Sequence, residues 1–414
     1  MKSTIRYYSA RLRKALKLVR NLSGIMEVPS VSNFGELQRR IIARYSEKSR
    51  KPRILLVTSN GAGLGHLTRL SAVSRYLDSE TLIYTMSSAY KKIGRDPDTI
   101  IYFPSYGDLG MDGSIWNRFM QAHLEATIDA FNPTLVVFDG TFVYRGVTGS
   151  CRKFGIPLVW LQRGAWKTDV DKRSRQRHNA IKYCDRVVIP KDYGVVEKVD
   201  CGPEIEVNYV NPIVLGEQSE SLSKEEAREI LDIPDGKKPV LIQLGAGRIN
   251  SIESALEAAV LTVGDLGPDW LPVVVNNPLS HGKIAESVHS ISYYPLSQVF
   301  NAFEFGVFAA GYNSVQESVA FGLPGVFLPN EFTKTDDQVA RARGLEAAGL
   351  GICAMSTSAL RQGIFALADV KNRDSIAQRM SSVRSANGAP ETARYLEALV
   401  SAETQESNTR SHNE

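Results

Sequence analysis

Short apolar segments that alternate with helical patterns constrain this chain more than any other feature. Most of these segments have a continuous apolar centre, which fits a strand buried on both faces of a sheet. Parallel sheets that are covered by helices on both faces show this alternation. A first series of strands is expected at Arg53–Thr58, Thr81–Thr85, Ile100–Phe103, Thr134–Phe138, Pro157–Leu161, Arg186–Ile189 and Glu206–Val210.

A second series begins after Asn211-Pro212, which breaks the strand pattern and is followed by a polar stretch. Ser223 and Glu226 have the spacing of a capping box that opens a new helix. The strands expected beyond it are Pro239–Leu244, Leu271–Val275, Phe305–Ala309, Gly325–Leu328 and Gly351–Ala354. Because 414 residues exceed one ordinary core, we predict an α/β fold of two doubly wound, Rossmann-like domains.

The domain boundaries are placed where the sequence pattern changes. A basic helical extension is expected over residues 1–51, the first α/β domain over 52–211 and the second over 212–390. Residues 391–414 are expected to form a terminal helix followed by a disordered tail.

Positive charge is concentrated in the leading segment. Residues 1–51 contain 13 Lys and Arg against 3 Asp and Glu, whereas the rest of the chain is mildly acidic. An acidic body argues against a nucleic-acid partner. Residues 5–20 have the periodicity of a basic amphipathic helix. This pattern fits either peripheral contact with an anionic membrane or packing against protein.

The remaining compositional features indicate a cytoplasmic protein, at the inner face of the membrane if the leading helix binds lipid. No apolar run is long enough to span a bilayer, and the basic N-terminus lacks the apolar region of a secretory signal. The four cysteines are scattered, without the spacing of a zinc site or a disulfide framework. A reducing compartment fits this usage.

The first glycine-rich stretch, NGAGLGHLTR at residues 60–69, follows the strand Arg53–Thr58. Its third glycine position is His66 and no acid ends the next strand, so a dinucleotide fingerprint is not met; a P-loop motif is also absent. Gly63 and Gly65 permit a ligand to approach the backbone at the carboxyl end of the strand. At the first turn of the next helix, His66 fits a neutral general base or a histidine that only caps the turn.

The second glycine-rich stretch, AGYNSVQESVAFGLPGVFLP at residues 310–329, predicts a turn, a helix from Ser314 to Phe321 and a return strand. The amides from Gly311 to Ser314 lie at a helix start, which favours phosphate. Glu317 has two interpretations. It completes a capping box with Ser314, or it faces the crevice and binds the vicinal hydroxyls of a ribose.

Two further segments carry polar groups that suit a sugar nucleotide. LGAGR at residues 244–248 offers amides and the cation of Arg248 to a diphosphate, although Arg248 also fits a solvated loop. Asp336, Asp337 and Gln338 supply groups that suit sugar hydroxyls, or an acidic N-cap of a helix over residues 339–347.

Taken in order, these motifs resemble the GT-B nucleotide-sugar glycosyltransferases from about residue 53 to residue 347. The branch with the peptidoglycan lipid-intermediate N-acetylglucosaminyltransferase has a GGTGGH loop, a TGNPV junction, a second glycine loop and a donor-binding helix. The similar segments here are GAGLGH at 61–66, YVNPIV at 209–214, VLIQLGAGR at 240–248 and the stretch at 310–329.

The last stretch also resembles the plant glycosyltransferase signature HCGWNSxxE…DQ. The aligned residues are Asn313, Ser314, Glu317, Asp337 and Gln338. The leading histidine of the signature is replaced by Ala309 and its tryptophan by Tyr312, and KTDDQ replaces a glutamine-rich segment of the relatives. These departures leave the donor sugar and the nucleobase open.

The resemblance implies a cleft between an acceptor-side first domain and a nucleotide-sugar-binding second domain. It implies that His66 is the base, beside Gly63 and Gly65, and that Glu317 binds the ribose of the donor. The residues implied to hold the diphosphate are Gly245, Gly247, Arg248, Gly311, Asn313 and Ser314. Asp337 and Gln338 are implied to contact the transferred sugar.

We therefore expect a hexosyltransferase that moves a sugar from a nucleotide diphosphate sugar, a UDP-sugar, to an acceptor hydroxyl with inversion. No D-x-D motif sits where a metal-dependent transferase would need it, so neither a metal nor another cofactor is expected. Asp139, after the strand Thr134–Phe138, fits an orienting partner of His66 or a turn residue. Arg163 also follows a strand and is a candidate for the acceptor side.

The acceptor is not defined by the sequence. A lipid-linked acceptor would suit the basic leading helix, and a polysaccharide is equally open. Two alternatives to transfer share the fold: an enzyme that resembles UDP-N-acetylglucosamine 2-epimerase, and a non-catalytic, membrane-associated protein that binds nucleotide sugars.

Overall fold

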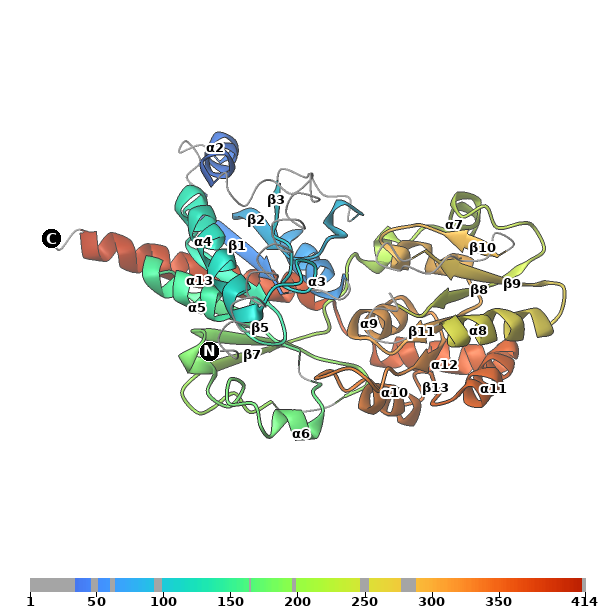
Figure 1. Cartoon of the computed structure of the whole chain (residues 1–414). Coiled ribbons are helices and arrows are strands. Elements are labelled where there is room, and N and C mark those ends of the chain that lie inside the picture. Colours follow the sequence, from blue (N-terminus) through green and yellow to red (C-terminus); the bar gives the residue numbers. More distant parts are fainter. Residues whose placement is uncertain are drawn as a thin grey trace, which may run out of the picture.

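Two parallel β-sheets organise the protein, as a computed structural model shows (Figure 1). The structure describes residues 34–45, 51–59, 64–92, 99–163, 165–195, 199–245, 253–276 and 288–411. Each sheet carries helices on its faces, and the two sheets lie in separate halves of the molecule. The predicted architecture of two Rossmann-like α/β units is confirmed. The expected basic helix over residues 5–20 lies outside the described residues.

The first unit contains a seven-stranded sheet in the order β3-β2-β1-β4-β5-β6-β7, with every pairing parallel. Its strands are β1 (Arg53–Thr58), β2 (Glu80–Thr85), β3 (Ile100–Tyr102), β4 (Leu135–Asp139), β5 (Leu158–Leu161), β6 (Arg186–Pro190) and β7 (Glu206–Val210). The direction of the strand order reverses between β1 and β4. In open α/β sheets, ligands bind at the carboxyl ends of the strands at such a point.

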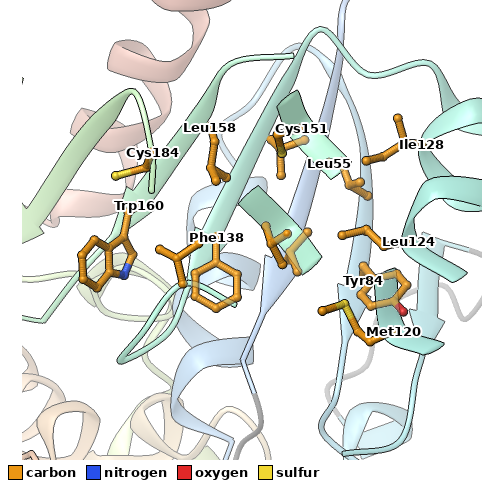
Figure 2. Close-up of a cluster of buried hydrophobic side chains, with 14 of the residues drawn as sticks. Leu55, Tyr84, Met120, Leu124, Ile128, Phe138, Cys151, Leu158, Trp160 and Cys184 are labelled. Carbon is orange, nitrogen blue, oxygen red and sulfur yellow. The ribbon is translucent and has the colours of Figure 1, made fainter. Parts of the chain in front are cut away.

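Both faces of this sheet are covered, which explains why its central strands β1, β4 and β5 are largely apolar. Leu55 and Phe138 face a cluster that includes α4 (Gly113–Phe131) and α5 (Arg145–Phe154), shown in Figure 2. The neighbouring residues Leu56 and Val137 face the opposite cluster, which includes α3 (Gly65–Ser74). Two further helices of this unit are α2 (Phe34–Arg44) and α6 (Thr168–Asp171), and α2 packs on α4.

The second unit contains a six-stranded parallel sheet in the order β10-β9-β8-β11-β12-β13. Its strands are β8 (Lys238–Gln243), β9 (Trp270–Val275), β10 (His289–Ile291), β11 (Phe305–Ala309), β12 (Gly325–Leu328) and β13 (Ile352–Cys353). Its helices are α7 (Lys224–Ile230), α8 (Glu253–Asp265), α9 (Tyr312–Phe321), α10 (Gln338–Ala347), α11 (Thr357–Ala368) and α12 (Val370–Val383). The capping box predicted from Ser223 and Glu226 is confirmed at the start of α7. Here the order reverses between β8 and β11, and α9 follows β11 directly.

The last helix returns to the first unit. Helix α13 (Gly388–Ser411) packs against α3 and β7, and Ala393 and Leu396 join the cluster that contains Leu67. The expected disordered tail is wrong as far as Ser411, because the helix continues to that residue. The two crossings between the units lie side by side, since the amide of Gly388 donates to the carbonyl of Pro212 at 2.9 Å.

Among the described residues, no helix combines the length and the apolar character needed to cross a bilayer.

The two units also meet where α10 packs against the loop that follows β6. Gly344 of α10 faces Gly194, and a Cβ atom at position 344 would overlap the carbonyl oxygen of Gly194. The same loop carries Asp192, whose carboxylate pairs with Arg341 of α10 at 2.6 Å. A close approach of two glycine backbones therefore permits an ion pair between the units.

We predict that Gly344→Ala destabilises the protein by about 1–3 kcal/mol, because the new methyl group forces α10 away from the loop. Gly264, near the end of α8, is the matched control, since a Cβ atom there meets nothing within 4 Å. Gly264→Ala is expected to be neutral or to stabilise by about 0.5–1 kcal/mol through helix propensity. Urea denaturation of both variants checks this. Equal midpoints for the two variants would contradict the close packing.

Candidate active site

A buried carboxylate at the end of β4 organises the first half of the site. Asp139 is the last residue of β4, and its side chain faces the first turn of α3. Nδ1 of His66 lies 2.6 Å from Oδ1 of Asp139. Arg69, one turn further along α3, donates from Nε to Oδ2 at 2.9 Å and from Nη2 to Oδ1 at 2.6 Å. The structure thus answers the question left open by the sequence: Asp139 contacts His66 and is not merely a turn residue.

The electrostatics of this cluster leave His66 neutral. Burial lowers the pKa of His66; Asp139 acts in the opposite direction, and the positive charges of Arg69 and Arg163 add to the lowering. Burial opposes ionisation of Asp139, but the charges of Arg69 and His66 outweigh it and hold the pKa of the carboxyl below its usual value. Nε2 of His66 has no hydrogen-bond partner among the described residues. A neutral imidazole with Nδ1 turned toward Asp139 presents Nε2 as a proton acceptor.

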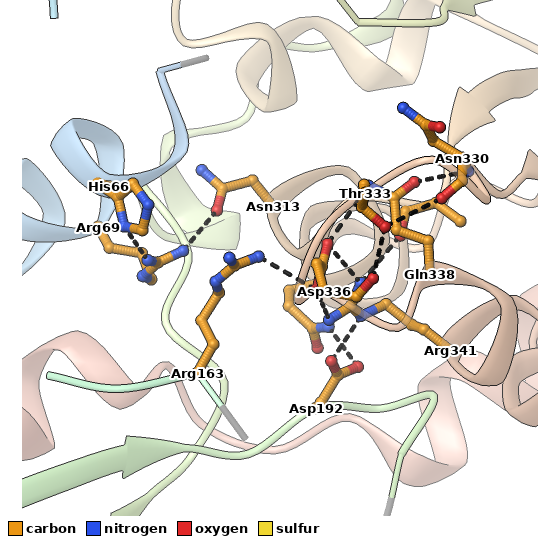
Figure 3. A network of polar contacts seen from close by, with 12 residues as sticks. His66, Arg69, Arg163, Asp192, Asn313, Asn330, Thr333, Asp336, Gln338 and Arg341 are labelled. Carbon is orange, nitrogen blue, oxygen red and sulfur yellow. Dashed lines mark hydrogen bonds and ion pairs between the residues drawn. The ribbon is translucent and has the colours of Figure 1, made fainter. Parts of the chain in front are cut away.

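The two halves of the site touch through Asn313 of α9. Nη1 of Arg69 donates to Oδ1 of Asn313 at 3.4 Å, and Nδ2 of Asn313 donates to the carbonyl of Gly65 at 3.5 Å (Figure 3). His66 neighbours Gly65, and Glu317 lies one turn after Asn313 on the same helix. The first turn of α3 and the first two turns of α9 therefore lie next to one another, and we call the region where they meet the gap between the units.

Helix α9 begins earlier than the sequence predicts, and this changes the meaning of Glu317. The N-cap is Gly311, which makes no side-chain cap, and Ser314 lies inside the helix. The capping-box interpretation of Ser314 and Glu317 is therefore wrong. Among the described residues, no acceptor is found for the amides from Gly311 to Ser314. These amides at a helix N-terminus are suited to an anion.

Among the described residues Glu317 has no charged partner, unlike Asp139, Asp192 and Asp336, which each pair with an arginine. Burial raises the pKa of Glu317 to about 8. Its side chain makes no hydrogen bond to a described residue, and Tyr294 is near enough for the Glu317 charge to act on the phenol. A partly exposed carboxylate held in this state is available to a ligand with hydroxyl donors.

A second ion-pair network joins the units beside this gap (Figure 3). Arg341 of α10 is fully buried and pairs with Asp336 at 2.9 Å and with Asp192 of the first unit at 2.6 Å. Arg163, which follows β5, pairs with Asp336 across the units at 3.2 Å. Burial opposes the charge on Asp336, but Arg341 and Arg163 hold the pKa of the carboxyl far below its usual value. A backbone bridge between Trp166 and Asp336 runs alongside.

The structure gives several predicted donor residues a structural partner. Asp337 caps α10, since Oδ1 accepts from the amide of Ala340 at 2.9 Å. Gln338 accepts from the amide of Asn330 at 2.9 Å and donates to Asp336 at 3.3 Å. The alternative of an acidic N-cap is confirmed for Asp337, and contact of Asp337 and Gln338 with a sugar stays a prediction.

The glycine loops are described only in part. Gly245 adopts a left-handed backbone with φ of 86°, which favours glycine. Gly63, Gly247 and Arg248 lie outside the described residues. In the part of the chain that is described, no three His, Cys, Asp or Glu side chains gather in a way that would hold a metal ion.

Sequence reasoning named Arg163 but missed two other arginines that hold this site together, Arg69 and Arg341. Arg69 is three residues after His66, so both lie on one helix face, and that spacing was a usable signal. Arg341 and Asp192 are separated by 149 residues, and no local pattern links them.

The two-sheet fold is that of the GT-B glycosyltransferases, as solved structures show. No protein-family model matches the chain. Among solved structures, the chain is similar to the spinosyn forosaminyltransferase SpnP, with a TM-score of 0.60 and 14% identity over 85% of this chain and 100% of that one. It is also similar to MurG of Acinetobacter baumannii, with a TM-score of 0.56 and 14% identity over 84% and 99% of the two chains. These similarities confirm the predicted GT-B fold.

Curated relatives confirm the predicted resemblance to the peptidoglycan branch. A UDP-N-acetylglucosamine–N-acetylmuramyl-(pentapeptide) pyrophosphoryl-undecaprenol N-acetylglucosamine transferase of Symbiobacterium thermophilum is 23% identical over 371 residues, covering 82% of this chain and 94% of the relative. The enzyme of the same name from Bacillus licheniformis is 25% identical over 246 residues, covering 55% of this chain and 62% of the relative. All four proteins are glycosyltransferases, which favours transfer over the epimerase alternative.

The unpaired state of Glu317 predicts a stability that depends on pH. The pKa of Glu317 is about 8 in the folded protein, against an ordinary value of 4.5. Between pH 4.5 and pH 8 this carboxyl therefore binds more protons in the folded state than in the unfolded state. Stability conferred at this position therefore falls as pH rises from roughly 4.5 to 8. We expect Glu317→Gln to stabilise the unliganded protein at pH 8 by about 1 kcal/mol or more, where each kcal/mol raises the melting temperature by about 2–4 °C. At pH 4.5 we expect no such gain in stability.

Melting curves at several pH values check this expectation. Glu229→Gln on the exposed side of α7 is the control and should show no gain that grows with pH. A Glu317→Gln variant that is equally stable to the parent at pH 8 would show that the carboxylate has a hidden partner.

Proposed function

We propose that this protein transfers a sugar from a UDP-sugar to an acceptor hydroxyl in a single inverting displacement. One observation carries the proposal: the His66–Asp139 pair lies beside the first turn of α9, whose amides have no acceptor among the described residues and which leads to Glu317. The first side is suited to removing a proton, and the second is suited to holding an anion and hydroxyl groups. The sequence relatives, which are transferases named for a UDP-sugar donor, support the donor class.

In the proposed reaction, the acceptor hydroxyl gives its proton to Nε2 of His66 as its oxygen attacks the anomeric carbon. The bond between that carbon and the diphosphate oxygen breaks, and the electron pair leaves with the nucleoside diphosphate. Asp139 stabilises the imidazolium that forms at His66. Attack from the face opposite the leaving group inverts the anomeric carbon.

The donor is proposed to lie along α9. The amides from Gly311 to Ser314 hold the diphosphate, helped by the side chain of Asn313 and by the loop from Gly245 to Arg248. Glu317 accepts hydrogen bonds from the ribose hydroxyls, for which its free carboxylate and its place one turn beyond Asn313 are support. The charge of the leaving diphosphate is stabilised by these groups, so we propose that transfer needs no metal or other cofactor.

The acceptor is proposed to be lipid-linked and to be met at the cytoplasmic face of a membrane. The relatives are named for an acceptor on undecaprenol. In the first unit, four large apolar side chains are exposed on α4 and in loops of this unit: Tyr106, Ile115, Phe119 and Phe142. Exposed apolar side chains of this kind suit a lipid surface, and the basic segment 1–20 adds attraction to anionic headgroups. A polysaccharide acceptor stays an alternative.

We predict that UDP raises the apparent melting temperature and that His66→Ala leaves this shift intact. A ligand at 100 times its Kd adds about 2.7 kcal/mol, or about 5–10 °C for a domain of this size. With UDP-N-acetylglucosamine as the probe and lipid-linked acceptors offered, His66→Ala should reduce UDP release by about 100-fold to 10,000-fold. His178→Ala is the control, because that imidazole pairs with Asp200 at 3.1 Å away from the gap.

The alternatives give different results in the same assay. Conversion of UDP-N-acetylglucosamine to its 2-epimer without acceptor would identify an epimerase. A UDP-dependent shift without turnover over a wide acceptor panel would identify a binding protein. Absence of a shift with any nucleoside diphosphate would reject the donor site on α9.

Removal of divalent metal is predicted to leave transfer intact, because helix amides and side chains stabilise the leaving group. The measurement compares UDP release before and after treatment with excess EDTA. Activity that is lost with EDTA and restored by Mg²⁺ or Mn²⁺ would contradict this part of the proposal.

A further inference from the structure

Arg69 touches the groups on both sides of the catalytic gap. Its side chain is buried, and its guanidinium donates to both carboxylate oxygens of Asp139. Nε lies 2.9 Å from Oδ2 and Nη2 lies 2.6 Å from Oδ1. Nη2 also lies 2.9 Å from Nδ1 of His66. On the other side, Nη1 reaches Oδ1 of Asn313 at 3.4 Å, and the guanidinium lies 5.2 Å from the ring centroid of Tyr312.

The ionised carboxylate of Asp139, 2.6 Å from Nδ1, favours a proton on that nitrogen of His66. Oδ1 of Asp139 is shared, because Nδ1 of His66 and Nη2 of Arg69 both lie 2.6 Å from it. When the single proton of the neutral ring is on Nδ1, it is donated to Asp139 and Nε2 is left as an acceptor. A second proton on Nε2 would place an imidazolium beside a guanidinium in a buried site, where like charges repel strongly.

The other charged groups around His66 do not remove this repulsion. Asp139 from β4 is the one carboxylate that acts on the imidazole, and the bidentate pairing with Arg69 already compensates its charge. Arg163 after β5 is a second cation that acts on the ring. From α9, the facing group is the neutral amide of Asn313. Without Arg69, His66 and Asp139 would form a buried ion pair that favours the imidazolium.

We propose that Arg69 is a positioning residue that holds Asp139 by both oxygens and keeps Nε2 of His66 unprotonated at neutral pH. Its part in transfer rests on the proposed function, since an unprotonated Nε2 is the atom that takes the acceptor proton. The contact with Asn313 also ties the base to the first turn of α9, where the donor diphosphate is proposed to bind. Arg69 thereby links donor and acceptor sides of the reaction.

The titration of His66 tests this proposal directly. Protein with ¹³C-labelled histidine is followed by NMR from pH 5 to pH 9, and His66→Gln identifies the His66 signal among the six histidines. Arg69→Met removes the charge at similar volume, and we expect it to raise the titration midpoint of His66 by about 1–3 units. Arg69→Lys retains the charge and is expected to give a smaller rise.

Two further variants keep the test decisive. Arg69→Gln also removes the charge but can still donate to Asp139, so it gives the same rise if Arg69→Met does not fold. Arg53→Met is the matched control: Arg53 is a largely buried arginine that pairs with Glu80 at 2.9 Å, at the opposite end of β1. This control should leave the His66 midpoint unchanged.

An unchanged His66 midpoint in folded Arg69→Met or Arg69→Gln protein would overturn the proposal, as would an equal rise in Arg53→Met. The measurement uses neither donor nor acceptor. Its failure would leave the proposed function standing, whereas absence of UDP binding would reject the proposed function and leave the titration result intact.

Discussion

The carboxylate of Asp139 is the constraint on which the site depends. It is fully buried at the end of a central strand, and an unpaired charge in that position would cost several kcal/mol. Its partners, His66 and Arg69, come from one face of α3, so satisfying the carboxylate fixes the position of that helix relative to β4. The imidazole is thereby held at the carboxyl ends of β1 and β4, where the strand order reverses.

The same need for compensation joins the two units. Burial opposes the charge on Arg341, but Asp192 and Asp336 more than offset it and raise its pKa. Because Asp192 belongs to the first unit and Asp336 to the second, Arg341 is satisfied only when both units are in place. Loss of one partner of a buried pair costs roughly 3–5 kcal/mol. The facing of α3 and α9 across the gap is therefore supported by an ion-pair network beside it rather than by the weak contacts of Asn313.

Much of the fold was readable from the sequence, because buried parallel strands are apolar throughout. Apolar runs predicted β1, β4, β8 and β11 in this way, and glycines indicated the turns after them. The strand β10 (His289–Ile291) was not expected, since three residues of which two are polar carry no apolar run or periodicity. Likewise, the start of α9 was misplaced because Ser314 and Glu317 imitate a capping box, a local pattern that the turn at Gly311 overrides.

The site was readable only where chemistry and position coincided. His66 and Glu317 follow glycine-rich turns, so their types and places pointed to function. Asp139 was ambiguous because its partner is 73 residues away, and Arg69 was missed because a buried arginine on a helix has no signature of its own. Pairings of this kind are set by the parallel pairing of β1 with β4, two strands that are far apart in the sequence.

The buried carboxylates near the gap differ in whether an arginine compensates their charge, and this difference separates structural groups from a ligand-binding one. Asp139, Asp192 and Asp336 each have an arginine within hydrogen-bond distance, so their charges are compensated in the unliganded protein. Among the described residues Glu317 has no such partner, and burial without a compensating charge raises its pKa to about 8. The fold thus compensates three of these carboxylates and leaves Glu317 uncompensated. Glu317 is therefore retained at the expense of stability. Hydroxyl groups of a ligand would supply the hydrogen bonds that the protein does not, so the uncompensated carboxylate marks where the ligand belongs.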